Sequence, residues 1–219
     1  MSDNVIDRVS PNLLFRHRLN CQATKQSWGN TGVALKDTHL VTSFGRSEGQ
    51  NEFAQLKMAW SAEGLFFDVV VSGKNQSIWC RPTQILESDS VMVFVDTRNT
   101  QSIHRASRFC HWFVFLPAGM GGDREKPGGM MLKINRSKED PKTFQAYKSF
   151  VACKKKPTGY RMQFHVAAAA LTGWDSGEHR QIGFNYLIKD RELGEQTLAT
   201  GSSFPIASDP SLWHPVRLV

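Results

Sequence analysis

The sequence lacks the features that mark several common protein classes. Its longest apolar stretch, residues 166–171, is mostly alanine and is too short to span a bilayer. Its four cysteines stand far apart and form no CxxC pair, which argues against a zinc knuckle or a thioredoxin-type site. We therefore expect free and mainly buried thiols, with one disulfide open if the protein is exported. The cysteines are Cys21, Cys80, Cys110 and Cys153.

The sequence also has little clustered charge and no visible leader. Residues 1–8 contain no basic segment followed by an apolar one, so we expect a cytoplasmic protein, with export open if a leader has been trimmed. The formal net charge is +7, but the densest basic run is only Lys154, Lys155 and Lys156. Nucleic-acid binding needs clustered charge, so we interpret this run as a solvated turn and expect no nucleic-acid partner.

Catalytic signatures are missing as well. The chain has no GxSxG elbow, HExxH helix, P-loop or GxGxxG turn, and no distinctive acidic pair for glycoside hydrolysis. We predict that the protein is not an enzyme. A hydrolase remains the rival hypothesis, because catalytic triads assemble from residues distant in sequence.

Aromatic and β-branched residues are abundant instead. Aromatic residues make up 11% of the 219 positions, which excludes the composition of a disordered chain. Short strand-like runs bounded by turn residues recur along the chain, and no long amphipathic helix interrupts them. They cover residues 56–60, 65–71, 90–96, 109–115, 160–166 and 181–188, with weaker runs near 132–135, 149–153 and 212–219.

This pattern predicts an all-β fold, an antiparallel two-sheet β-sandwich of jelly-roll type with at most short helical turns. We expect a single domain over residues 1–219, in which only residues 1–30 are a candidate for a separate N-terminal arm. The glycine-rich segment 117–129 is predicted to be an exposed loop that contains no core element.

Two blocks of the sequence carry a family resemblance. The first is a hairpin over residues 56–71 followed by the Asp-led strand 88–96. The second comprises a strand at 159–166, a short turn at 171–173 and a strand over 182–190 that ends on aspartate. In order and spacing, the blocks resemble the family 9 carbohydrate-binding modules and their DOMON-like relatives. This resemblance implies a β-sandwich that binds a sugar.

The binding residues of that family carry over poorly. The family clamps a sugar between two exposed tryptophans and orients its hydroxyls with charged side chains. Leu86 stands where one of those tryptophans is expected, and Met92 replaces the acidic residue of the following strand. Trp79 is a candidate substitute on a displaced loop; the alternative is a tryptophan buried under that loop.

Sugar recognition needs aromatic faces together with planar polar groups, and three regions offer them. Trp79 and Arg81 lie in one loop, Trp174 lies in a polar turn, and the densest hydrogen-bonding loop follows residue 96. The alternative for this last loop is a solvated connection whose arginines cover the sheet edge. The predicted carbohydrate-binding residues are Trp79, Arg81, Arg98, His104, Arg105, Arg108 and Trp174.

The resemblance also raises the question of metal and haem. Family 9 modules commonly hold structural calcium, so Asp89, Asp96 and Asp190 are candidate ligands; the alternative is that they cap turns. Some DOMON domains bind haem through methionine and histidine. We expect no haem here, because strand residues of these types are more often packed in the core. The residues in question are Met92, His111, Met162 and His165.

The sequence thus predicts a non-catalytic module with a carbohydrate ligand. The alternative is a protein-interaction or assembly module that keeps the sandwich, has lost the sugar clamp and has a protein partner. A continuous apolar patch on an outer sheet would favour this alternative. Convergent carboxylates, or a nucleophile with histidine in a deep pocket, would favour an enzyme.

Overall fold

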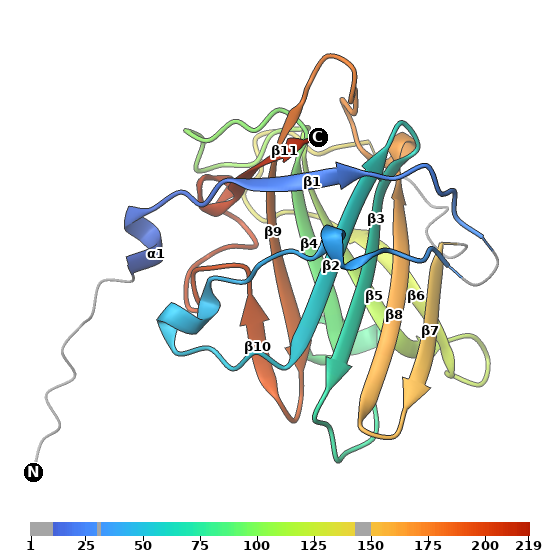
Figure 1. The fold of residues 1–219 in the computed structure, drawn as a ribbon. Coiled ribbons are helices and arrows are strands. Elements are labelled where there is room, and N and C mark those ends of the chain that lie inside the picture. Colours follow the sequence, from blue (N-terminus) through green and yellow to red (C-terminus); the bar gives the residue numbers. More distant parts are fainter. Residues whose placement is uncertain (1–10, 30–31, 143–149) are drawn as a thin grey trace, which may run out of the picture.

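The computed structural model describes residues 11–29, 32–142 and 150–219, which form two β-sheets facing each other (Figure 1). The predicted β-sandwich with only short helical turns is confirmed. The strands are β1 (Leu19–Ala23), β2 (Ala54–Ser61), β3 (Gly64–Ser72), β4 (Ser90–Asp96), β5 (Cys110–Met120), β6 (Lys126–Leu132), β7 (Val151–Lys156), β8 (Gly159–Ala167), β9 (Gln181–Asp190), β10 (Gly194–Thr197) and β11 (His214–Leu218). The helical turns are α1 (Pro11–Leu14), η1 (Asp37–His39), η2 (Gly45–Glu48), η3 (Pro82–Glu87), η5 (Ala168–Ala170) and η6 (Pro210–Leu212).

Strand β1 connects the two sheets. One sheet runs in the order β6-β5-β4-β9-β11-β1, with β10 beside β9, and the other runs β1-β2-β3-β8-β7. The first half of β1 pairs with β11 and its end pairs with β2, both in parallel, whereas all other described pairs are antiparallel. The sandwich is therefore not wholly antiparallel as predicted, and residues 19–23 of the expected N-terminal arm belong to the sheets. Residues 1–10 of that arm lie outside the described residues.

Strand β4 shows why a continuous apolar run predicts a central strand of the fold. Every one of its residues is buried, so the strand is covered on both faces. Val91, Val93 and Val95 point into the core between the sheets. Met92 and Phe94 point outward into a second apolar cluster, which is covered by loops and includes Trp213. A central strand covered on both faces needs apolar residues at consecutive positions, as this one has.

Stacked aromatic rings join the two sheets. Phe115 of β5 stacks on Phe164 of β8 with ring centroids 3.9 Å apart, and Phe67 of β3 lies 6.0 Å from Phe184 of β9. These side chains are fully buried. Burial of each such ring contributes about 1.5–3 kcal/mol to folding, so these contacts help to hold the two sheets together.

The prediction of an exposed loop over 117–129 is wrong. Strand β5 continues through Met120 and β6 begins at Lys126, so only a short exposed turn separates them. The glycines serve packing within the sheet. A Cβ atom on Gly129 would lie 2.5 Å from the ring of Phe115, its cross-strand partner. Glycine at this position leaves room for that ring. Composition alone does not reveal this packing role, because a glycine-rich segment is typical of a loop.

Other predictions have mixed outcomes. The β2–β3 hairpin is confirmed, with Ser61 opposite Gly64. The weaker runs 132–135 and 149–153 correspond only in part to β6 and β7, and the C-terminal run supplies β11. All four cysteines are free thiols, two of them buried and two half-buried. None of the helices in the described part of the chain is long and apolar enough to cross a membrane.

Candidate ligand-binding site

An open groove of about 580 Å³ lies beside Trp79. One wall is the connection between β3 and β4, which carries Trp79 and the short turn η3. The opposite wall is the end of β9 with the turn into β10. The groove is lined by Trp79, Gln84, Glu87, Lys189, Asp190, Arg191, Gly194 and Glu195.

A buried cluster of three charges stands behind the groove. The ammonium nitrogen of Lys74 lies 3.2 Å from Oδ2 of Asp89 and 2.5 Å from Oδ2 of Asp190. The lysine side chain is 3% exposed and both carboxylates are fully buried. Burial acts to lower the pKa of Lys74, but the hydrogen bond to Asp190 and the charges of both aspartates outweigh it and raise the pKa. The lysine therefore stays protonated.

The same aspartates hold both walls of the groove. Asp89 accepts hydrogen bonds from the backbone N–H of Trp79, at 2.9 Å, and of Arg191, at 2.8 Å. Asp190 accepts the backbone N–H groups of residues 192 and 193 in the β9–β10 turn. Asp89 contacts both walls and shares the ammonium of Lys74 with Asp190. The position of Trp79 is therefore tied to that of Arg191.

The groove combines an aromatic ring with hydrogen-bonding groups. The indole of Trp79 is half-buried, and the guanidinium carbons of Arg81 and Arg191 lie 5.1 and 4.7 Å from its ring centroid. Lys189 lies between two carboxylates, 3.7 Å from Glu87 and 3.4 Å from Glu195. Donors and acceptors beside an apolar ring are the groups that a polyhydroxylated ligand requires.

The remaining predicted ligand residues lie elsewhere. Asp89, which binds the Trp79 loop, precedes β4, whereas Arg98 follows the strand, so the two ends are roughly 20 Å apart. Arg98 donates to the carbonyl oxygen of Gly173 at 2.7 Å and is thereby joined to the turn that carries Trp174. Trp174 is half-buried and packs against the central core. The predicted residues therefore divide into separate groups.

The arginines of the β4–β5 loop contact the protein itself. Arg98 and Arg108 lie over the ring of Phe109, at 4.8 and 5.1 Å from its centroid. Arg105 donates to the carbonyl oxygen of Arg136 at 2.9 Å. These contacts match the alternative interpretation, in which the loop arginines cover the sheet edge. Their role in binding a ligand stays a prediction.

A histidine, an aspartate and a serine meet near the end of this loop. Nδ1 of His104 lies 3.0 Å from Asp209 and 3.2 Å from the hydroxyl of Ser211. A catalytic triad needs the aspartate on one ring nitrogen and the serine on the other, but here both contact Nδ1. The His104 side chain is also 78% exposed, so no water-excluded site surrounds it. This trio does not have the geometry of a hydrolase.

The three candidate metal ligands do not converge. Asp89 and Asp190 lie together, but the cation between them is the ammonium of Lys74. Asp96 is at the far end of β4, where it accepts backbone N–H groups of residues 98 and 100, as the turn-capping alternative expects. Among the residues that the structure describes, no three His, Cys, Asp or Glu side chains are grouped to hold a metal ion.

The histidines considered for haem are engaged in hydrogen bonds. Nε2 of His111 accepts the backbone N–H of Thr172 at 2.9 Å, so Nδ1 carries the proton and donates to the carbonyl oxygen of Val95. Burial lowers the pKa of His111 to about 4, which keeps the ring neutral. Nε2 of His165 lies 3.0 Å from the carbonyl oxygen of Glu63. Met92 and Met162 are buried in the core.

Two positions explain why the family's sugar clamp does not carry over. Met92 is 2% exposed and lies in the outer apolar cluster beneath loops, so a ligand cannot reach this face of β4. Leu86 is 47% exposed but offers no aromatic face. Met92 is thus inaccessible and Leu86 is accessible but not aromatic, so neither position offers the contact that the resemblance places there.

Sequence reasoning missed most of the groove. Lys74 carries no sequence signal, because a lone lysine after a strand is normally solvated. Glu87, Lys189 and Glu195 are equally ordinary as surface residues. Trp79 and Asp190 are the lining residues that the sequence pointed to, and the charged turn 190–194 directly after a long strand is a further signal for the opposite wall.

Comparison with known proteins gives structural neighbours but no sequence relatives. No family model and no curated protein sequence matches the chain. A family 9 carbohydrate-binding module from Caldicellulosiruptor kristjanssonii in complex with glucose aligns at a TM-score of 0.61 and 12% identity, over 93% of this chain and 96% of that one.

Two further structures support the same fold. A family 9 module from C. kristjanssonii in complex with cellotriose gives a TM-score of 0.58 at 13% identity, with coverage of 92% and 93%. A protein from Bacteroides uniformis gives 0.51 at 9% identity, with coverage of 93% and 98%. The predicted resemblance is thus confirmed at the level of structure: this chain has the β-sandwich fold of the family 9 carbohydrate-binding modules.

Proposed function

We propose that the protein is a non-catalytic carbohydrate-binding module that holds a neutral sugar in the groove beside Trp79. The observation that carries the proposal is the half-buried indole of Trp79, which has guanidinium groups over its ring and carboxylates nearby. The apolar C–H face of a pyranose stacks on such a ring, while its hydroxyls need both donors and acceptors around the edge.

The charges of the groove favour a neutral ligand. The groove and the cluster behind it hold four positive and four negative side chains. They are Lys74, Arg81, Lys189 and Arg191 against Glu87, Asp89, Asp190 and Glu195. Neither sign of charge is left in excess, so a carboxylated or phosphorylated ligand gains little here. The volume of about 580 Å³ falls within the usual range for small-ligand pockets. A mono- or disaccharide fits this space.

Arg81 and Arg191 then act on the ligand rather than on the ring alone. Both side chains are exposed, so either can leave the indole face without breaking a buried contact. Their planar guanidinium groups present paired donors to vicinal hydroxyls. In the free protein they cover the ring, and in the complex the sugar replaces one of them on the indole.

The test is a calorimetric titration with glucose, xylose and cello-oligosaccharides. We expect saturable binding to the wild-type chain and a loss of about tenfold or more in Trp79→Ala, on the order of 1.4 kcal/mol. Trp174→Ala tests the other predicted stacking residue, which lies at the other end of the sandwich, and should bind these sugars as the wild type does. No saturable binding to any of these sugars, or equal binding by wild type and Trp79→Ala, would overturn the proposal.

The alternative is a protein-interaction module. The observation in its favour is that Met92 is buried and Leu86 offers no aromatic face, so two contacts that the resemblance implies are missing. However, the large apolar side chains that are exposed among the described residues lie outside the interiors of strands, so they make no continuous patch on an outer sheet. They are Leu14, Phe15, Leu40, Leu86 and Val219. We therefore favour sugar binding.

A further inference from the structure

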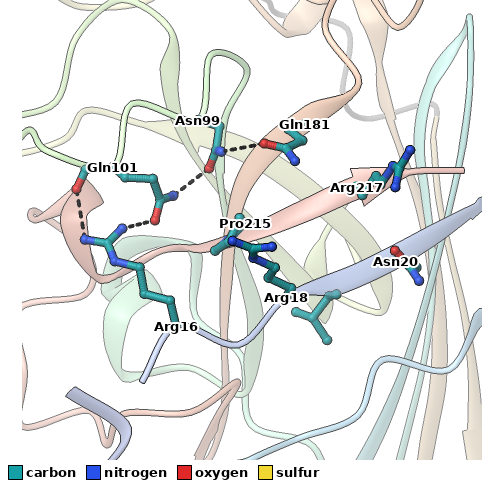
Figure 2. Close-up of a pocket in the computed structure, with 9 residues that line it drawn as sticks. Arg16, Arg18, Asn20, Asn99, Gln101, Gln181, Pro215 and Arg217 are labelled. Atoms are coloured by element: carbon teal, nitrogen blue, oxygen red, sulfur yellow. Dashed lines mark hydrogen bonds between the residues drawn. The ribbon is translucent and has the colours of Figure 1, made fainter. Parts of the chain in front are cut away.

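A second open cavity, of about 530 Å³, crosses the outer face of the sheet that contains β11 (Figure 2). It lies where β1, β11 and the start of β9 run side by side, below the turn that follows β4. Arg16, Arg18 and Arg217 supply its charge, and Asn20, Asn99 and Gln181 supply side-chain amides. We call it the arginine cleft. None of these residues is among the predicted ligand residues, although Asn99 lies in the hydrogen-bonding loop that follows residue 96.

Strand register places these groups in one plane. Asn20 of β1 pairs with Arg217 of β11, and Arg217 pairs with Gln181 of β9, so the three side chains form a row across three strands. Arg18 lies just before β1, level with Pro215 in the same register. The floor of the cleft is therefore built on regular strands, which fixes the spacing of its polar groups.

The side of the cleft is a chain of hydrogen-bonded amides. Gln101 donates to Oδ1 of Asn99, and Asn99 donates to Gln181 at 3.4 Å (Figure 2). Gln101 also donates to the carbonyl oxygen of Trp213 at 3.1 Å. The guanidinium of Arg16 donates to the side-chain and backbone oxygens of Gln101. The wall is thus preset before any ligand arrives.

Gly183, on the β9 part of the floor, allows the turn that carries Asn99 to pack closely against it. A Cβ atom on Gly183 would lie 3.2 Å from Cβ of Asp96 and 3.7 Å from Oδ1 of Asn99. Asn99 itself has a φ of 50°, a left-handed conformation that asparagine tolerates better than most residues. The turn after β4 therefore reaches over β9 into the cleft.

The charge of the cleft is unbalanced. Three arginines line it, and none of the lining residues is acidic. Within the described residues, neither Arg18 nor Arg217 forms an ion pair. Guanidinium groups that face one cavity repel each other, and an oxyanion between them reverses that repulsion while matching their planar paired donors.

We propose that the arginine cleft binds an oxyanion carried on a hydroxylated ring, namely a carboxylated or phosphorylated sugar. The arginines recognise the oxyanion, and the amides of Asn20, Asn99 and Gln181 pair with ring hydroxyls, because an amide both donates and accepts. The inference does not rest on the Trp79 groove, since that groove adjoins the start of β4 and the cleft adjoins its end. A preference for anions separates the two sites chemically.

The experiment titrates the protein at low salt with glucuronate, glucose 6-phosphate, glucose and inorganic phosphate, followed by calorimetry. We expect at least one of the two anionic sugars to bind the cleft with 1:1 stoichiometry and more tightly than inorganic phosphate. The double variant Arg18→Gln/Arg217→Gln should lose about tenfold or more in affinity for that sugar, because charge-assisted contacts are removed. Both side chains are exposed, so the variant should fold.

Two controls keep the result specific. Lys154→Gln removes one charge from β7, at the far edge of the other sheet, and should bind as the wild type does. Trp79→Ala should also keep its affinity for the anionic sugar, even if it loses neutral sugars. Equal affinity of the double variant and wild type overturns the inference. The inference is also overturned if neither anionic sugar binds, or if inorganic phosphate binds at least as tightly as the better of the two.

Discussion

Replacing Lys74 by methionine tests the charge cluster that positions Trp79. The change leaves the carboxylates of Asp89 and Asp190, both fully buried, without the ammonium that lies 3.2 and 2.5 Å from them. Removal of one partner from a buried ion pair costs about 3–5 kcal/mol, and here two carboxylates are left to repel each other. Each keeps its backbone hydrogen bonds, so we expect a loss of about 4 kcal/mol rather than complete unfolding.

Urea unfolding at neutral pH measures this loss. With a slope of about 2 kcal/mol per molar urea, the midpoint should fall by about 2 M. Lys154→Met, on an exposed side chain, should change the free energy of unfolding by no more than about 0.5 kcal/mol. Adding Asp190→Asn to Lys74→Met should recover part of the loss, because it removes one of the two facing charges. A shift below about 1 kcal/mol in Lys74→Met would refute the reasoning.

The same cluster predicts how stability depends on pH and how it responds to calcium. Because the pKa of Lys74 is raised above 10.5, its stabilisation is complete below pH 10.5 and is lost as pH rises through the folded-state pKa. In the wild type the lysine occupies the place of a cation, so neither chelator nor calcium should shift Tm. In Lys74→Ala the vacated carboxylates should make Tm rise with calcium, as differential scanning fluorimetry would show.

Three further outcomes are expected. Burial lowers the pKa values of His111 and His214 from 6.5 to about 4, so stability should fall as pH drops from 6.5 towards 4, by up to about 1.4 kcal/mol per unit and histidine; urea midpoints that stay constant over this range would contradict it. Trp213→Ala should lower the free energy of unfolding by about 3–5 kcal/mol, because the ring is 1% exposed within the outer apolar cluster; thermal unfolding measures this. Gly64→Ala, whose Cβ would lie 2.1 Å from a backbone oxygen, should cost on the order of 3 kcal/mol in urea, well above Gly194→Ala, where the added Cβ meets nothing within 4 Å.

The sequence predicted the central strands well because their burial is local information. Both faces of β4 are covered, so its residues are apolar at consecutive positions, as the run from Val91 to Val95 shows. The same holds for β5 around Phe113 and Phe115. Consecutive letters of the sequence are enough to reveal a strand that is covered on both faces, so the fold class was within reach.

Strand β1 was out of reach for the opposite reason. Its five residues carry one buried side chain, Cys21, and polar Asn20 and Gln22 face outward. The strand is specified by backbone pairing with β11 and β2, which lie far along the chain. Lys74 shows the same limit at the level of the site. Its burial depends on contacts with Asp89 and Asp190, which are distant in sequence, and no local sequence pattern predicts such contacts.

The position of β1 between β11 and β2 ties completion of the fold to the last strand of the described chain. While the polypeptide is being synthesised, residues 19–21 have no partner until residues 214–218 emerge, and the edge of β9 stays open for the same interval. Contacts of such long range slow folding, and open strand edges are prone to pairing between molecules. A chain truncated before Trp213 should therefore aggregate rather than fold into a smaller sandwich.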